Sequence, residues 1–120
     1  MLTAGTALAQ DGSDDPHGPF IHTVYFWLNN PDSREDNRKL LEGLNMIKEI
    51  EHIREGYVGV PAPTDREVID SSYDFSITFI FDNLAEEQAY QNHPTHLTFV
   101  EEYQHLWKRV VVYDTLPPGK

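Results

Sequence analysis

The sequence of 120 residues contains no cysteine, few cations and no long apolar run. The absence of cysteine excludes disulfides, thiolate catalysis and zinc sites with cysteine ligands. Nine Lys and Arg stand against twenty Asp and Glu, which gives a formal net charge of −11. A chain this acidic lacks the positive surface that binds phosphate backbones, so we expect no nucleic-acid partner. No apolar stretch reaches the roughly 20 residues that span a bilayer, so we expect no membrane partner.

The N-terminal residues differ in character from the rest of the chain. Ala7-Leu8-Ala9 resembles the small-residue cleavage box of a secretory signal, and a polar stretch rich in Asp, Gly and Pro follows it. Two interpretations stay open: the remnant of a signal peptide that directs export, or an Ala-rich start of a cytoplasmic protein. We expect a signal-like segment and flexible linker over residues 1–19, one domain over residues 20–116, and a tail over residues 117–120.

The domain shows four segments with the composition and periodicity of β-strands. In residues 73–81 every second side chain is aromatic or aliphatic, and the opposing set is Asp74, Ser76, Thr78 and Ile80, whereas residues 20–28 are apolar on both faces. Residues 53–60 and the Val-rich residues 109–114 complete the set. We therefore expect a sheet of four strands.

Helices are predicted between these strands. Asp32-Ser33 with Asp36 is a start signal, and one helical stripe follows it, formed by Leu40, Leu41, Leu44 and Ile47. Asn83 is expected to cap a short helix that ends near Asn92, and Pro94 suits the first position of another helix. The resulting β-α-β-β-α-β order predicts a ferredoxin-like α+β sandwich.

The expected sheet has a second apolar face. Ile21, Tyr25 and Trp27 lie on the side of the first strand opposite to Val24 and Phe26. Helices on one side of a sheet leave the other side open, and a soluble monomer rarely exposes a large apolar face. We therefore predict a homodimer with a barrel-like core between its subunits.

Two histidines and a tyrosine are the candidate site residues. A stripe at steps of three or four begins with His96 in the amphipathic run after Pro94, and it comprises His96, Phe99, Val100, Tyr103 and Trp107. His22 alternates with Val24 and Phe26 on the first strand. Burial favours the neutral imidazole, which is a suitable base beside a carbonyl group. The alternative is that both histidines only satisfy hydrogen bonds in the core.

His93 precedes Pro94 and is expected to cap the helix, with its ring near the surface. His93, His96 and His22 also offer three nitrogen ligands for a metal. Pro94 interrupts the helical spacing between the first two, however, and no carboxylate is obviously placed beside them. We therefore expect neither a metal site nor another cofactor.

Five segments resemble the stress-responsive dimeric A/B-barrel (Dabb) family in their order and spacing, over nearly all of residues 20–115. They are Ile21-His22-Thr-Val-Tyr-Phe-Trp27, Val58-Gly59-Val-Pro-Ala-Pro63, Ser72-Tyr73-Asp74-Phe75, Ala89-Tyr90-Gln-Asn-His-Pro-Thr-His96, and Leu106-Trp107 through Val112-Tyr113-Asp114. The resemblance implies a ferredoxin-like protomer and a homodimer that closes a dimeric α/β barrel.

The resemblance extends to members of the olivetolic acid cyclase type, which perform an intramolecular aldol cyclisation without metal or organic cofactor. It implies that His96 is the general base, that Tyr90 orients it or holds a substrate carbonyl, and that His22 lines the pocket. The expected pocket lies between sheet and helices and is lined by His22, Val24, Phe26, Tyr90, His93, His96 and Phe99.

Two functions stay open from the sequence. The first is a cofactor-free cyclase or lyase that acts on a small, polyketide-like carbonyl compound by histidine general-base catalysis. The second is a non-catalytic, stress-responsive dimer with a binding or structural role.

Overall fold

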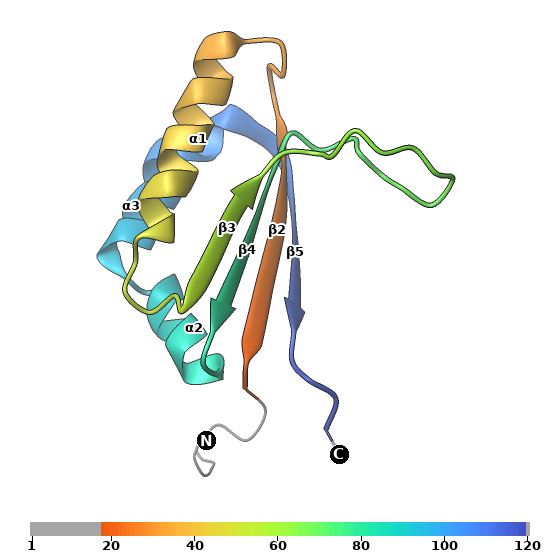
Figure 1. Ribbon diagram of the computed structural model, residues 1–120. Coiled ribbons are helices and arrows are strands. Elements are labelled where there is room, and N and C mark those ends of the chain that lie inside the picture. The colour runs from red at the N-terminus through yellow and green to blue at the C-terminus, as the bar shows by residue number, and fades with distance from the viewer. Residues whose placement is uncertain (1–17, 120) are drawn as a thin grey trace.

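The computed structural model describes residues 18–119, and the signal-like residues Ala7-Leu8-Ala9 lie outside this range. Figure 1 shows a four-stranded sheet with all helices on one face. The elements are β2 (Phe20–Leu28), α1 (Arg34–Lys48), β3 (Glu55–Gly59), β4 (Phe75–Phe81), α2 (Leu84–Gln91), α3 (Pro94–Tyr103), the 3₁₀-helix η2 (Gln104–Leu106) and β5 (Trp107–Thr115). The sheet order is β3-β4-β2-β5 and every pairing is antiparallel. The predicted ferredoxin-like α+β fold is confirmed.

Strand β2 lies at the centre of the sheet and sets its register. Val24 pairs with Ile77 of β4 on one side and with Val112 of β5 on the other. Residues of β2 alternate between buried and half-buried along its whole length, as the two-residue period of a strand requires. The fully buried series, which includes His22, faces the helices, so β2 brings this histidine into the core.

Helix α1 begins as the sequence predicts. The Ser33 hydroxyl accepts the backbone N–H of Asp36 at 3.1 Å, and Leu40, Leu44 and Ile47 are buried. Leu41 is 39% exposed, so its predicted place in the buried stripe is wrong. One residue turns a helix by about 100°, which moves Leu41 from the centre of the stripe to its flank.

Helices α2 and α3 have the caps that the sequence predicts. The Asn83 side chain accepts the N–H of Glu86 at 2.9 Å, and Nδ1 of His93 accepts the N–H of Thr95 at 3.0 Å. Pro94 occupies the first turn of α3.

The predicted helical run to Trp107 is too long. Helix α3 ends at Tyr103, η2 follows, and Trp107 begins β5, where it pairs with Leu28. The Trp107 ring still stacks on Phe99 at 5.6 Å. The apolar period therefore identified its core contact correctly and its secondary structure incorrectly.

Helices α1 and α3 pack closely against each other through Gly43. A Cβ atom at this glycine would lie 2.8 Å from the Tyr103 ring and 2.9 Å from the Phe99 ring. Because glycine has no side chain there, α1 and α3 approach each other closely. None of the described helices is long and apolar enough to cross a membrane.

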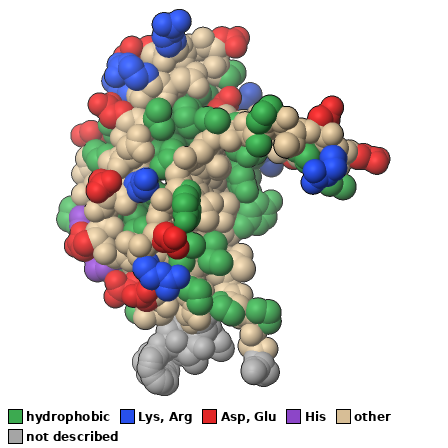
Figure 2. All heavy atoms as spheres, in the orientation of Figure 1, with side chains coloured by type: hydrophobic (Ala, Val, Ile, Leu, Met, Phe, Trp, Pro, Cys, Tyr) green, Lys and Arg blue, Asp and Glu red, His purple; other side chains and the backbone are tan. Residues whose placement is uncertain are grey.

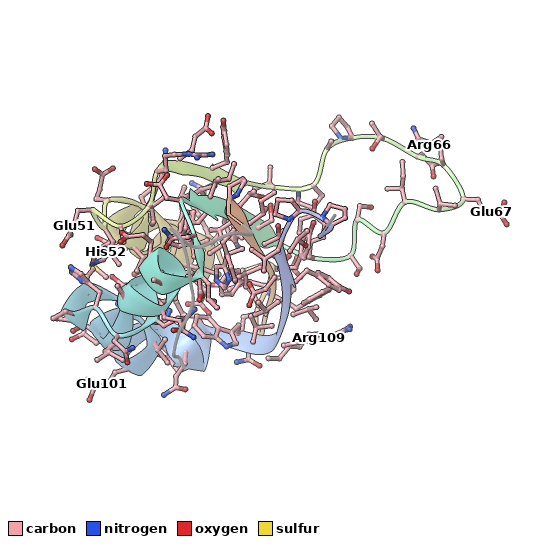
Figure 3. The ribbon with its side chains drawn as sticks, turned by 90° about the horizontal axis from the view of Figure 1, so that it is seen from below. Glu51, His52, Arg66, Glu67, Glu101 and Arg109 are labelled. Atoms are coloured by element: carbon pink, nitrogen blue, oxygen red, sulfur yellow. The ribbon has the colours of Figure 1, made fainter. Side chains whose placement is uncertain are left out.

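The face of the sheet opposite to the helices, here called the open face, has no covering layer within the described chain (Figure 1). It carries Tyr25, Trp27, Tyr57, Val111 and Tyr113. Residues 60–74, here called the arm, connect β3 to β4 and project away from the body on this side of the sheet (Figures 1 and 3). In Figure 2, charged side chains gather on the helices and at the arm tip, whereas hydrophobic ones lie along the sheet.

Candidate functional site

A cavity of about 330 Å³ lies between the sheet and helix α3. This volume is at the lower end of the range of about 300–1,000 Å³ found for small-molecule sites. Its polar lining residues are His22, Tyr90, Gln91, His96 and Gln104. The apolar ones are Val24, Phe26, Ile47, Ile77, Phe99, Val100, Trp107, Val110 and Val112.

Six of the seven residues expected to line a pocket border this cavity: His22, Val24, Phe26, Tyr90, His96 and Phe99. The seventh, His93, lies outside the lining and caps α3 instead. Its Nε2 is 3.3 Å from a carboxylate oxygen of Glu51, so both ring nitrogens are engaged away from the cavity.

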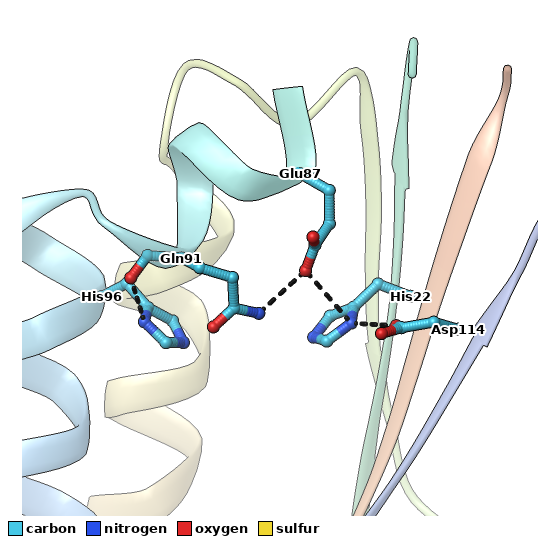
Figure 4. A network of polar contacts seen from close by, with 5 residues as sticks. All are labelled: His22, Glu87, Gln91, His96 and Asp114. Atoms are coloured by element: carbon cyan, nitrogen blue, oxygen red, sulfur yellow. Dashed lines mark hydrogen bonds and ion pairs between the residues drawn. The ribbon is translucent and has the colours of Figure 1, made fainter. Parts of the chain in front are cut away.

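His96 lies in the first turn of α3 with its Nδ1 3.1 Å from the backbone carbonyl oxygen of Gln91 (Figure 4). A carbonyl oxygen only accepts hydrogen bonds, so Nδ1 carries the proton and donates it. The lone pair of neutral His96 is therefore on Nε2. Burial lowers the pKa of His96 below its ordinary value; the bond to Gln91 opposes this shift and the charge of His22 adds to it. His96 is thus a neutral base at physiological pH.

His22 has a carboxylate partner on the neighbouring strand. Its Nδ1 lies 2.6 Å from Oδ1 of Asp114, to which it donates a hydrogen bond. The two residues are direct partners in the β2–β5 register. This bond fixes the orientation of the His22 ring and does not involve its other nitrogen, Nε2. Figure 4 shows the rings of His22 and His96 pointing toward one another from β2 and α3.

Glu87 of α2 lies between Gln91 and His22 and interacts with both. It is 5% exposed, and its Oε2 accepts a hydrogen bond from Nε2 of Gln91 at 2.9 Å and lies 3.8 Å from Nδ1 of His22. Glu87, Gln91 and Asp114 are not among the site residues predicted from the sequence. Helical spacing relates Glu87 to Tyr90 and Gln91, and strand pairing relates Asp114 to His22. The helical spacing and the pairing of the two strands are the signals from which these three residues could have been found.

Tyr90 is 1% exposed and is surrounded by rings. Its ring centroid lies 4.7 Å from that of His96, 5.8 Å from that of His22 and 5.2 Å from that of Phe81. Within residues 18–119, no hydrogen bond reaches its hydroxyl group. Burial, with a further contribution from Glu87, raises the pKa of Tyr90, so the phenol keeps its proton. A buried hydroxyl without a partner is costly, and a ligand acceptor would satisfy it.

One cluster among the described residues has the chemistry of metal ligands: His22, Glu87 and Asp114, whose ligand atoms lie within 4.8 Å of one another. The separation of 2.6 Å between His22 and Asp114 is that of a hydrogen bond. Bonds of about 2.0–2.2 Å to one tetrahedral ion would place such atoms roughly 3.3 Å apart. This arrangement therefore fits a shared proton better than a metal ion.

Fold and cavity together define a ferredoxin-like α+β protomer with a histidine-lined cavity between sheet and helices. The chain belongs to the stress responsive A/B barrel domain (Dabb) family, whose model matches residues 20–116.

Solved structures share this fold at low sequence identity. A Dabb family protein from Mesorhizobium loti is 22% identical, with a TM-score of 0.70, over 85% of this chain and 100% of that one. A dimeric ferredoxin-like protein of unknown function from Thermobifida fusca is 16% identical, with a TM-score of 0.67, over 90% and 99%. The hydroxynitrile lyase from Passiflora edulis is 17% identical, with a TM-score of 0.68, over 88% and 98%. No curated protein matches the sequence.

Proposed function

We propose that this protein is a homodimer in which each subunit binds a small, partly apolar carbonyl compound in the cavity between sheet and helices. The subunit acts on that compound as a cofactor-free cyclase or lyase, with His96 as general base. Tyr90 holds the carbonyl oxygen and His22 borders the reacting group.

The observation that carries this proposal is the pairing of a neutral histidine with a phenol that has no hydrogen-bond partner among residues 18–119, both at one cavity. The rings of His96 and Tyr90 are 4.7 Å apart, and the Nδ1 bond to Gln91 leaves Nε2 of His96 as the basic atom. A buried hydroxyl without a partner in the described part of the chain requires an explanation, and a ligand oxygen in the cavity would supply that partner.

These groups can catalyse an enolisation. The Tyr90 hydroxyl donates a hydrogen bond to the substrate carbonyl oxygen, and His96 Nε2 takes a proton from the adjacent carbon. The electron pair of the broken C–H bond forms the enolate. In a cyclase, the enolate carbon attacks a second carbonyl of the same molecule, and the proton on His96 returns to the new alkoxide. The reverse sequence breaks a carbon–carbon bond, which is a lyase reaction.

The fold neighbours support two parts of the proposal. The hydroxynitrile lyase from Passiflora edulis connects lyase chemistry with this fold. The Thermobifida fusca neighbour is described as dimeric, and the apolar open face of this chain would be covered in a homodimer.

The general-base proposal can be tested before the natural substrate is identified. Simple methyl ketones and β-diketones are incubated with the protein in D₂O, and deuterium incorporation next to the carbonyl is followed by NMR. We expect the wild-type protein to accelerate this exchange and His96→Ala to lose the acceleration. His105→Ala removes an exposed histidine outside the cavity lining and serves as the control.

A panel in which no compound exchanges faster with the wild-type protein than in buffer contradicts general-base catalysis. Equal loss in His105→Ala and His96→Ala would show that the exchange does not arise at the cavity.

A further inference from the structure

Carboxylates lie beside the histidine of the cavity that projects from β2. None of the residues that line the cavity is Lys or Arg. Two carboxylates lie beside Nδ1 of His22, a residue that lines the cavity. They belong to Glu87 and Asp114. A bound anion beside His22 would therefore meet two carboxylates, and no Lys or Arg of the lining would offset them.

Glu87 is the stronger of the two charges toward the cavity. Its side chain is 7% exposed, whereas that of Asp114 is 45% exposed, so water screens Asp114 far more. The carboxylate of Glu87 accepts one hydrogen bond, from the neutral amide of Gln91, a residue that also lines the cavity. Figure 4 shows Glu87 above His22, with Gln91 between Glu87 and His96.

A buried charge acts strongly over short distances. Two like charges about 6 Å apart at an effective dielectric constant of about 20 repel strongly enough to lower affinity by a factor of about 100. Screening by water reduces this factor, and we expect a discrimination of about tenfold. The Tyr90 hydroxyl can donate to a ketone oxygen as well as to a carboxylate oxygen, so the charge of Glu87 is what distinguishes the two ligands.

We propose that the cavity selects uncharged carbonyl compounds and rejects their carboxylate analogues, and that Glu87 is the residue that determines this selectivity. The proposal rests on the proposed function, because it concerns the ligand of the same cavity. It narrows the substrate class to neutral ketones, aldehydes and polyketones with an apolar remainder. Free keto acids are excluded when their carboxylate would lie near His22.

A matched pair of ligands tests the selectivity. In 2-heptanone and hexanoate, the same pentyl chain carries a carbonyl group, and a methyl group in one replaces a charged oxygen in the other. Binding to the full-length protein is measured by ¹H–¹⁵N NMR titration at neutral pH and low salt. We expect 2-heptanone to bind about tenfold more tightly than hexanoate, or better.

Two variants separate the local charge from the overall charge. Glu87→Gln keeps the size of the side chain and an oxygen that accepts from Gln91, and should reduce the ketone preference about tenfold. Glu86→Gln removes the adjacent charge in the same first turn of α2, where Glu86 pairs with His52 outside the cavity. We expect Glu86→Gln to keep the wild-type preference.

The contrary outcomes of the binding experiment distinguish three claims: the selectivity, the role of Glu87 and the carbonyl-binding function. Wild-type protein that binds hexanoate as tightly as 2-heptanone overturns the selectivity while leaving a small-molecule site in place. An unchanged preference in Glu87→Gln, or an equal reduction in Glu86→Gln, overturns the role of Glu87. Absence of binding by both ligands overturns the selectivity together with the proposed carbonyl-binding function.

Discussion

A histidine that donates through Nδ1 to a backbone carbonyl keeps its Nε2 lone pair only while the ring is neutral. Burial lowers the pKa of His96 below 6.5, which is its ordinary value, despite the opposing bond to Gln91. Between these two pKa values the unfolded chain binds more protons than the folded one, so stability rises with pH in that window. The stability from neutral His96 is complete above pH 6.5 and is lost as the pH falls through the folded-state pKa.

We therefore expect the acid limb of ketone exchange to have its midpoint below pH 6.5. We also expect the wild-type protein to lose more stability on acidification than His96→Gln. NMR titration of the His96 ring and urea unfolding at several pH values measure the two effects. A His96 ring that titrates above 6.5 would contradict the assignment of the neutral base.

Tyr90→Phe separates binding from stability at the same site. The Tyr90 hydroxyl has no hydrogen bond to lose within the described chain, and the ring contacts remain in phenylalanine. The urea midpoint should therefore stay constant or rise slightly. Affinity for 2-heptanone should fall by about fivefold to tenfold, the loss of one hydrogen bond of roughly 1 kcal/mol. A clear loss of stability instead would indicate a structural partner for the hydroxyl.

The sequence identified those site residues whose periodicity places them in the core. His22 alternates with Val24 on a strand, and His96 begins an apolar helical stripe. Glu87 and Asp114 were missed because acidic residues in a chain of net charge −11 are normally solvated. Only the register of β2 with β5 and the packing of α2 bring these two carboxylates to His22.

At the scale of single elements, the N-terminus of α3 connects a helix cap with the site. His93 accepts the N–H of Thr95, and His96 follows within the same turn. His93→Ala should lower stability by about 0.5–2 kcal/mol, the usual cost of losing a cap. It should also perturb the NMR signals of the His96 ring, since the first turn of α3 frays.

His93→Asn restores a capping oxygen but not the contact with Glu51, so it isolates the cap. Urea unfolding of both variants measures the difference. If His93→Asn were as unstable as His93→Ala, the contact of His93 with Glu51 rather than the cap would carry the stability.

Element types were more predictable than element ends. Caps at Ser33 and Asn83 and the proline at the start of α3 are local signals, because the hydrogen bonds involved join neighbouring residues. The end of α3 is not local. Trp107 continues the helical apolar period, yet it becomes a strand residue because β5 pairs with Leu28 of β2. Pairing between β5 and β2 decides the conformation of Trp107 against the helical apolar period, and this pairing cannot be predicted from the neighbouring residues alone.

At the scale of the whole molecule, the open face is an apolar surface that no layer of the described chain covers. A hollow of about 290 Å³ on it is lined by Tyr25, Trp27, Asp70, Tyr73, Arg109, Val111 and Tyr113. The Arg109 guanidinium lies 4.4 Å from the Trp27 ring centre. The arm projects beyond this face with Val68 85% exposed. An aromatic face and a projecting arm on the same side suit an isologous contact, in which each subunit presents both to its partner.

A charge placed on the open face should therefore separate the proposed homodimer. Tyr113 is 59% exposed on the open side of β5 and Leu97 is 55% exposed on α3, in the opposite layer. Both can accept a carboxylate without unfolding one subunit, because both already contact water. Tyr113→Glu, which places a charge in the proposed interface, should produce monomers at micromolar concentration, whereas Leu97→Glu should leave the dimer intact. Light scattering coupled to size exclusion measures both, and native mass spectrometry shows whether a small molecule remains bound to the separated subunits. A wild-type protein that is monomeric in this measurement would contradict the homodimer, since the open face would then be exposed to water in the stable protein.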